Sequence, residues 1–116
     1  MRADIAQMIR VSKRLTQAGG YLELDMAEQA SECLGDLGPL GPFEAEVELL
    51  RGEAFRRQHR FQEAAHSFQV AARSFSTRGT PETYLAMSMC YRQAGNMLEA
   101  VEMLARARGV KSEKAQ

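Results

Sequence analysis

Histidine, cysteine and arginine are the side chains of this sequence that could bind a metal ion, act as a nucleophile or contact phosphate. His59 and His66 have no second ligand pair at metal-binding spacing. Cys33 and Cys90 lack a CxxC or CxxH neighbour, and no serine or cysteine falls in a recognisable pattern with a histidine and a carboxylate. The sequence also holds no phosphate loop and no dinucleotide fingerprint. We therefore expect no metal site, no cofactor and no enzyme activity.

The chain has one cluster of basic residues, formed by Arg56, Arg57, His59 and Arg60. A phosphate backbone is a ligand that such a cluster can hold, so weak RNA or other nucleic-acid binding through this turn stays open as an alternative. Glu53 and Glu63 dilute the charge, and over the whole chain 15 Lys and Arg balance 15 Asp and Glu. This balance favours a solvated basic turn, and it disfavours nucleic acid and anionic membranes as partners.

The length of the chain allows one domain, over residues 1–116, with a real hydrophobic core. The N-terminal stretch is charged every few residues and has no apolar centre, which argues against a signal peptide. No stretch approaches the roughly 20 apolar residues that cross a membrane. We expect a cytoplasmic protein without membrane contact, in which Cys33 and Cys90 act as small apolar residues that are buried or half-buried.

The spacing of apolar residues predicts two helical pairs in the first two thirds of the chain, over residues 3–24 and 26–34, then 42–58 and 61–76. Gly19 and Gly20 weaken the first helix, so a kink or break there is as compatible with the sequence as a continuous rod. Asp25 and Glu28 resemble a capping box that would open the second helix. A long turn rich in glycine and proline separates the two pairs.

A third helical pair follows in the last third of the chain. Thr80 is expected to cap its first helix and Pro81 to occupy the first helical position. Gly95 breaks the pattern with a residue suited to a left-handed turn. The last helix is expected to end near Arg108, before a flexible tail at 109–116.

One skeleton recurs in all three pairs: an aromatic residue, an alanine nine residues later and a large residue four beyond that. The three sets are Tyr21, Ala30 and Leu34, then Phe55, Ala64 and Phe68, then Tyr91, Ala100 and Leu104. The offsets between the aromatic residues are 34 and 36 residues. A period of this length is typical of stacked helical hairpins, which bind other proteins far more often than they catalyse reactions.

This skeleton resembles the tetratricopeptide repeat. The third repeat fits the family pattern throughout, with Tyr84 and Met87 at its large positions, whereas the second has Glu48 and Arg51 where large apolar residues are expected. The resemblance implies an all-α fold, a right-handed superhelical array of about three antiparallel helix-turn-helix hairpins. Its repeats would cover about residues 3–38, 42–78 and 80–108.

In that family the first helices of successive hairpins line a concave groove that holds extended or helical peptides. The resemblance therefore implies a partner-binding groove made of Leu15, Leu22, Leu49, Glu53, Arg56, Arg57, Leu85, Met89 and Arg92. Such a surface suits an amphipathic segment with apolar anchors and some acidic residues. The same leucine spacing is also typical of a core covered by neighbouring helices. The residues with which some members clamp a terminal carboxylate are absent, so we expect no recognition of a C-terminal tail.

The implied function is a non-catalytic scaffold, adaptor or chaperone-like module for a protein or peptide partner. The last helix supports a second hypothesis, because it has more apolar positions than one neighbouring helix can cover: Met97, Leu98, Val101 and Met103. Methionine side chains are flexible and suit adaptable interfaces. The alternative is therefore a structural subunit that assembles through its C-terminal repeat, with a second copy or with another protein.

Overall fold

The structure, a computed structural model, describes residues 5–74 and 81–115. Within these ranges the chain forms a short 3₁₀ turn, Gly41–Phe43, and six α-helices: α1 Ile5–Glu23, α2 Ala27–Cys33, α3 Glu44–Arg57, α4 Phe61–Ser74, α5 Pro81–Gln93 and α6 Met97–Ala115. The prediction of an all-α fold is confirmed for the described residues, which contain no strand. The expected cap at Thr80 lies outside them.

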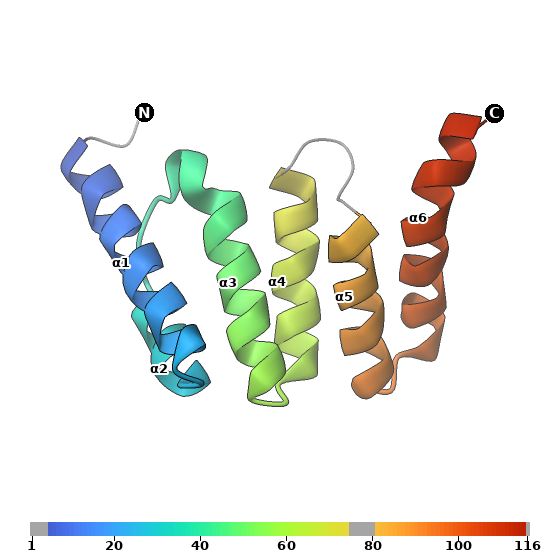
Figure 1. Ribbon diagram of the computed structural model, residues 1–116, viewed down its shortest axis with the longest axis horizontal. Coiled ribbons are helices and arrows are strands. Elements are labelled where there is room, and N and C mark those ends of the chain that lie inside the picture. The colour runs from blue at the N-terminus through green and yellow to red at the C-terminus, as the bar shows by residue number, and fades with distance from the viewer. Residues whose placement is uncertain (1–4, 75–80, 116) are drawn as a thin grey trace.

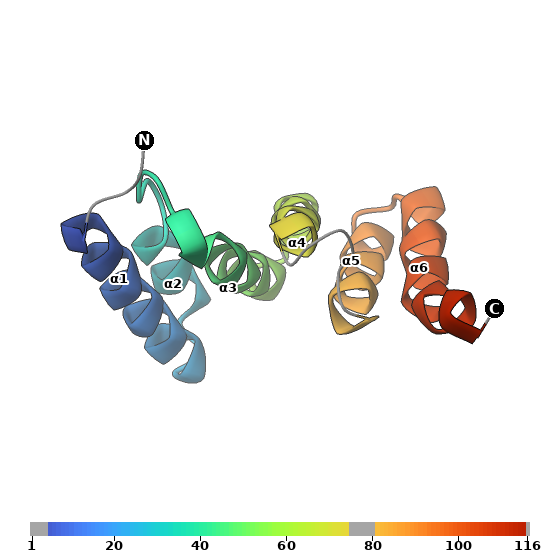
Figure 2. The same ribbon diagram turned by 90° about the horizontal axis from the view of Figure 1, so that it is seen from above.

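The helices stand side by side in chain order, with α1 at one end of the molecule and α6 at the other (Figure 1). Seen from above, they form an elongated row rather than a closed bundle (Figure 2). The molecule measures 45 × 31 × 22 Å along its principal axes. Each helix packs on the next one in the chain, and α1 also contacts α3.

The three hairpin turns have the same backbone geometry. Asp25, His59 and Gly95, which are 34 and 36 residues apart, all adopt a left-handed conformation, with φ of 60°, 63° and 87°. In each turn the amide of the next residue donates to the carbonyl of the repeated aromatic residue, at 2.8 Å to Tyr21, 2.9 Å to Phe55 and 2.8 Å to Tyr91. This bond and the left-handed residue satisfy carbonyl groups at the end of a helix, as in a Schellman motif. The sequence repeat is thus a repeat of turn geometry.

Several local expectations need correction. Asp25 does not cap α2, because it is the left-handed residue of the turn and α2 begins after Met26 without a side-chain capping bond. Of the two alternatives left open at Gly19 and Gly20, the structure has the continuous helix, because α1 runs through both residues. α6 does not end near Arg108 but continues to Ala115, since Gly109 is the only poor helix former there and lysine, glutamate and alanine favour helix.

The long turn before α3 is held against α1. Gln7 Nε2 donates to the carbonyl of Leu37 at 2.7 Å and to that of Pro39 at 2.9 Å, and Arg10 donates to Leu37 at 2.9 Å. These bonds place the Leu37 side chain, which is only 1% exposed, in the core. Pro42 lies in the 3₁₀ turn that leads into α3, where a missing amide hydrogen costs little.

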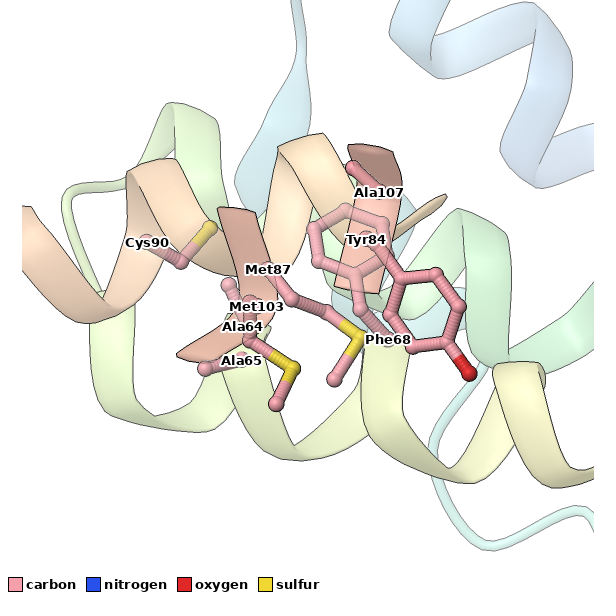
Figure 3. Close-up of a cluster of buried hydrophobic side chains, with 8 residues drawn as sticks. All are labelled: Ala64, Ala65, Phe68, Tyr84, Met87, Cys90, Met103 and Ala107. Carbon is pink, nitrogen blue, oxygen red and sulfur yellow. The ribbon is translucent and has the colours of Figure 1, made fainter. Parts of the chain in front are cut away.

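Two clusters of buried side chains hold the row together. The N-terminal cluster joins the first hairpin to α3 and consists of Val11, Ala18, Leu22, Ala30, Leu34, Leu37, Val47 and Ala54. The C-terminal cluster joins α4 to the third hairpin and consists of Ala64, Ala65, Phe68, Tyr84, Met87, Cys90, Met103 and Ala107 (Figure 3). Each cluster spans neighbouring hairpins, so each hairpin relies on the next to bury its apolar face.

Candidate protein-interaction surface

The residues predicted to line a groove differ in solvent exposure according to their position in the row of helices. Leu22 is 7% exposed and is buried among residues of α1, α2 and α3 in the N-terminal cluster, so its assignment to an exposed groove is wrong. Leu15 and Leu49 are half-buried and pack against the N-terminal and C-terminal clusters, respectively. By contrast, Leu85 is 44% exposed and Met89 is 51% exposed. The accessible apolar part of the predicted groove is therefore confined to α5.

The residues predicted at the edge of the last hairpin also fall into a buried and an exposed group. Met103 is 7% exposed and lies in the C-terminal cluster, so its assignment to the edge surface is wrong. It faces α4 and α5, next to Met87 in Figure 3. Met97, Leu98 and Val101 lie on other sides of α6 and are 55%, 70% and 60% exposed. These three side chains remain candidates for contact with a partner.

A hollow between α5 and α6 brings the two predicted sets together. Its volume is about 310 Å³, and it is lined by Leu85, Ser88, Met89, Arg92, Met97, Ala100, Val101 and Leu104. We call this the α5/α6 groove. The Ser88 hydroxyl donates to the carbonyl of Ala100 at 2.7 Å, which ties the two helices together at its floor. What remains accessible is mostly apolar, with one cation, Arg92, exposed at its rim.

No motif of the sequence predicted that Leu85 and Met89 share a surface with Met97 and Val101. The missing information was the packing angle of the last hairpin. The 36-residue offset could have supplied this information. It places Leu85 and Val101 at the positions equivalent to Leu49 and Ala65, so a surface shared by one pair is expected for the other. Ala100 and Leu104 appeared in the repeat pattern, but only as members of its repeated skeleton.

Three of the four charged residues predicted for the groove, Glu53, Arg56 and Arg57, lie on α3 and are bound to one another. Glu53 accepts hydrogen bonds from Arg56 Nε at 3.1 Å and from Arg57 Nε at 2.8 Å. Burial raises the pKa of the Glu53 carboxyl, but the bonds from Arg56 and Arg57 outweigh it, and the pKa is lowered overall. Arg57 also donates to the carbonyl of Leu22 at 2.8 Å, linking α3 to the end of α1. These side chains therefore stabilise the stack.

The basic turn is neutralised in the same way. Arg60 pairs with Glu63 at 2.7 Å, and its guanidinium lies 4.6 Å from the centre of the Phe55 ring. The bond from Arg60 lowers the pKa of Glu63. His59 is exposed beside Phe61, and His66 is exposed on α4. Because the guanidinium groups of Arg56, Arg57 and Arg60 are occupied by carboxylates, the turn offers little free positive charge to a phosphate backbone.

A second, smaller hollow joins this turn to α5. It has a volume of about 240 Å³ and is lined by Arg56, Arg57, His59, Phe61, Met89 and Gln93. Met89 borders both hollows, so the apolar surface of α5 continues toward the end of α3. Arg56 and Gln93 thus line the same hollow.

The burial of the two cysteines agrees with the prediction, although the Cys33 thiol also donates to the carbonyl of Arg14 at 3.5 Å. Cys33 is half-buried and Cys90 is fully buried, and both are free thiols. Burial raises the pKa of the Cys90 thiol to about 11. In the described part of the chain, no group of histidine, cysteine and acidic side chains is placed to hold a metal ion. Nor does any described helix combine the length and the apolar character that a membrane crossing requires.

A scan of the chain against protein-family models and a search of curated proteins both find no match.

Proposed function

We propose that the chain is a non-catalytic protein-interaction module, built as a right-handed tetratricopeptide-type superhelix of three hairpins. Support comes from the equivalent turns at Asp25, His59 and Gly95 and from cores that bridge neighbouring hairpins. The close approach of α3 and α4 adds to it, because a Cβ atom at Gly52 would lie 2.7 Å from the Phe68 ring. Small residues at such positions let two helix backbones meet.

The binding surface in this proposal is the α5/α6 groove. One observation carries it: four large apolar side chains around a single hollow, Leu85, Met89, Met97 and Val101, are 44% to 60% exposed. Contiguous exposed apolar surface marks sites of protein interaction, whereas isolated exposed apolar residues do not. The module therefore holds an apolar segment of a protein or peptide in this groove, as a scaffold or adaptor does.

Selection from a library of displayed random peptides tests this function. Immobilised wild-type protein should enrich peptides whose binding is lost with Leu85→Glu or Val101→Asp. Both substitutions fall on exposed positions, so helical circular dichroism should be unchanged. Ile9→Asp is the matched control, since Ile9 is 51% exposed on α1 and lies outside the groove. Enrichment of only those peptides that ignore both groove substitutions would refute the proposed site.

Self-assembly through α6 is the second candidate. It is favoured by Leu98, which is 70% exposed and is not among the residues that line the groove. Sedimentation analysis from about 1 μM to about 1 mM separates the candidates, because association at this affinity range shifts the mass with concentration. A constant monomer mass would remove self-assembly, and a dimer that Leu98→Asp abolishes would support it.

A further inference from the structure

The α5/α6 groove has counterparts on the two preceding hairpins. Shifting its eight lining residues back by 36 positions gives Leu49, Gly52, Glu53, Arg56, Phe61, Ala64, Ala65 and Phe68, all of which are buried or half-buried. Shifting by a further 34 positions gives Leu15, Ala18, Gly19, Leu22, Ala27, Ala30, Ser31 and Leu34, which are also buried or half-buried. On the last hairpin, by contrast, five of the eight equivalent residues are exposed: Leu85, Met89, Arg92, Met97 and Val101.

A helix covers each of the earlier surfaces. α3 lies against the first hairpin, and α5 lies against the second. α5 supplies Tyr84, Met87 and Cys90 to the C-terminal cluster, and Tyr91 packs against it. The large residues among them, Tyr84, Met87 and Tyr91, are spaced i, i+3 and i+7, which places them on one helix face.

The rim of the groove differs from its counterpart in charge. On the second hairpin Arg56 is paired with Glu53, but the residue equivalent to Glu53 on the last hairpin is Met89. Arg92, the equivalent of Arg56, has no ion-pair partner among the residues that the structure describes. Its exposed guanidinium is therefore available to a carboxylate of another molecule.

In a second copy, the helices equivalent to the expected docking helix, which are α1, α3 and α5, do not suit the groove. The residues of α1 equivalent to Tyr84 and Met87 are Arg14 and Gln17, and Arg14 already donates to the carbonyl of Cys33 at 3.1 Å. On α3 the equivalents are Glu48 and Arg51, which pair with each other at 2.9 Å. α5 has the required apolar face, but that face is buried in the C-terminal cluster. None of these three helices therefore offers a free apolar face at the positions equivalent to Tyr84 and Met87.

We propose that the α5/α6 groove binds an amphipathic helix of a partner protein, docked as α5 docks on the second hairpin. This inference rests on the proposed function and specifies the partner's chemistry. The bound helix presents large apolar residues at i, i+3 and i+7. It also presents a glutamate or aspartate at i+9 to Arg92, because Gln93, the i+9 residue of α5, lines the same hollow as Arg56, the counterpart of Arg92.

A synthetic peptide tests the inference. The probe is a fluorescently labelled helix of about 20 residues, a length at which an alanine-rich sequence is helical in water. It carries Tyr, Met and Tyr at i, i+3 and i+7 and Glu at i+9, and a scrambled peptide of the same composition is the control. Fluorescence anisotropy should give saturable binding to wild-type protein. Val101→Asp should weaken binding about tenfold or more, because it buries an unpaired charge. Ile9→Asp should have no effect.

Charge reversal adds a readout specific to the proposed register. Arg92→Glu should weaken binding of the Glu probe several-fold, and a second probe with Lys at i+9 should recover it on that variant. Equal binding of the scrambled peptide, or absence of the charge rescue, would overturn the inference. If the helical probe fails while selected peptides still depend on Leu85 and Val101, the helix is wrong but the site stands. If no peptide of any kind depends on these residues, the proposed function fails as well.

Discussion

The two junctions between hairpins have the same position in the repeat but different chemistry. Where α3 meets the first hairpin, Arg51 donates to the carbonyl of Leu34 at 3.0 and 2.6 Å and pairs with Glu48 at 2.9 Å. Where α5 meets the second hairpin, the equivalent positions hold Met87 and Tyr84, which are buried against Ala64, Ala65 and Phe68. The first junction therefore adds hydrogen bonds at the end of the short helix α2 to the apolar contacts of the N-terminal cluster, whereas at the second junction the equivalent residues make apolar contacts.

This difference bears on the α5/α6 groove. Directional hydrogen bonds such as those of Arg51 form only when the end of the neighbouring helix lies at one position. An apolar surface, by contrast, can pack against any helix of the right shape. The groove continues the apolar kind of junction, with Arg92 as its one exposed cation. We infer that the directional bonds of the first junction set the register of the array. The apolar surface of the last hairpin allows it to accept another helix.

Removing the Phe68 side chain should have the largest effect. Phe68 is 4% exposed in the C-terminal cluster, so Phe68→Ala should lower the free energy of unfolding by about 4 kcal/mol through lost burial and a cavity. This is a large share of the stability of a small domain. Urea denaturation followed by circular dichroism measures it. A loss below about 1 kcal/mol would mean that the apolar junction contributes little.

Changing Arg51 should have the next largest effect. Arg51→Met copies the residue of the second junction but leaves the Leu34 carbonyl and the Glu48 carboxylate without their donor. We expect a loss of about 2 kcal/mol in the free energy of unfolding. Lys13→Met, at an exposed position of α1, is the control and should change it little. The double variant Glu48→Tyr with Arg51→Met should lose less than the single one, since no carboxylate is then left unpaired.

Two glycines should respond in opposite directions. Gly52→Ala should destabilise the protein by about 1 to 3 kcal/mol, because its Cβ atom would press on the buried Phe68 ring. Gly19→Ala should stabilise it by up to about 1 kcal/mol through helix propensity alone, since a Cβ atom there meets no atom within 4 Å. Thermal unfolding of both variants gives the sign. Stabilisation by both would show that α3 and α4 are not in close contact.

Chemical modification of the two cysteine thiols tests how tightly the junctions are closed and perturbs the protein least. Cys33 is half-buried beside α1, whereas Cys90 lies inside the apolar junction with its pKa raised by burial to about 11. At pH 8 iodoacetamide should therefore modify Cys33 well before Cys90, because only the thiolate reacts. Mass spectrometry of the peptides distinguishes them. Modification of both at the same rate would mean that the apolar junction opens readily.

Hairpin order and turns could be predicted from the sequence because they depend on local signals. Pro81 and Gly95 stand where the expected helix starts and breaks, and the 34- and 36-residue offsets locate equivalent positions. The burial of Leu22 and Met103 could not be predicted, because periodicity does not say which neighbouring helix covers an apolar position. The role of Arg51 was hidden for a similar reason: its partner, Leu34, is brought near by tertiary packing. The burial of Leu37 likewise depends on tertiary contacts, because Gln7 and Arg10 of α1 donate to its carbonyl.

Methionine methyl groups allow the most direct test of the central claim, that the α5/α6 groove binds a helix. In a ¹³C-methyl NMR titration with the helical probe, the signals of Met89 and Met97, which line the groove, should shift with peptide concentration. Those of Met87 and Met103, in the C-terminal cluster, should move much less, and Met8 on α1 should not move. Shifts at Met8 without shifts at Met89 and Met97, or no shifts at all, would contradict the claim.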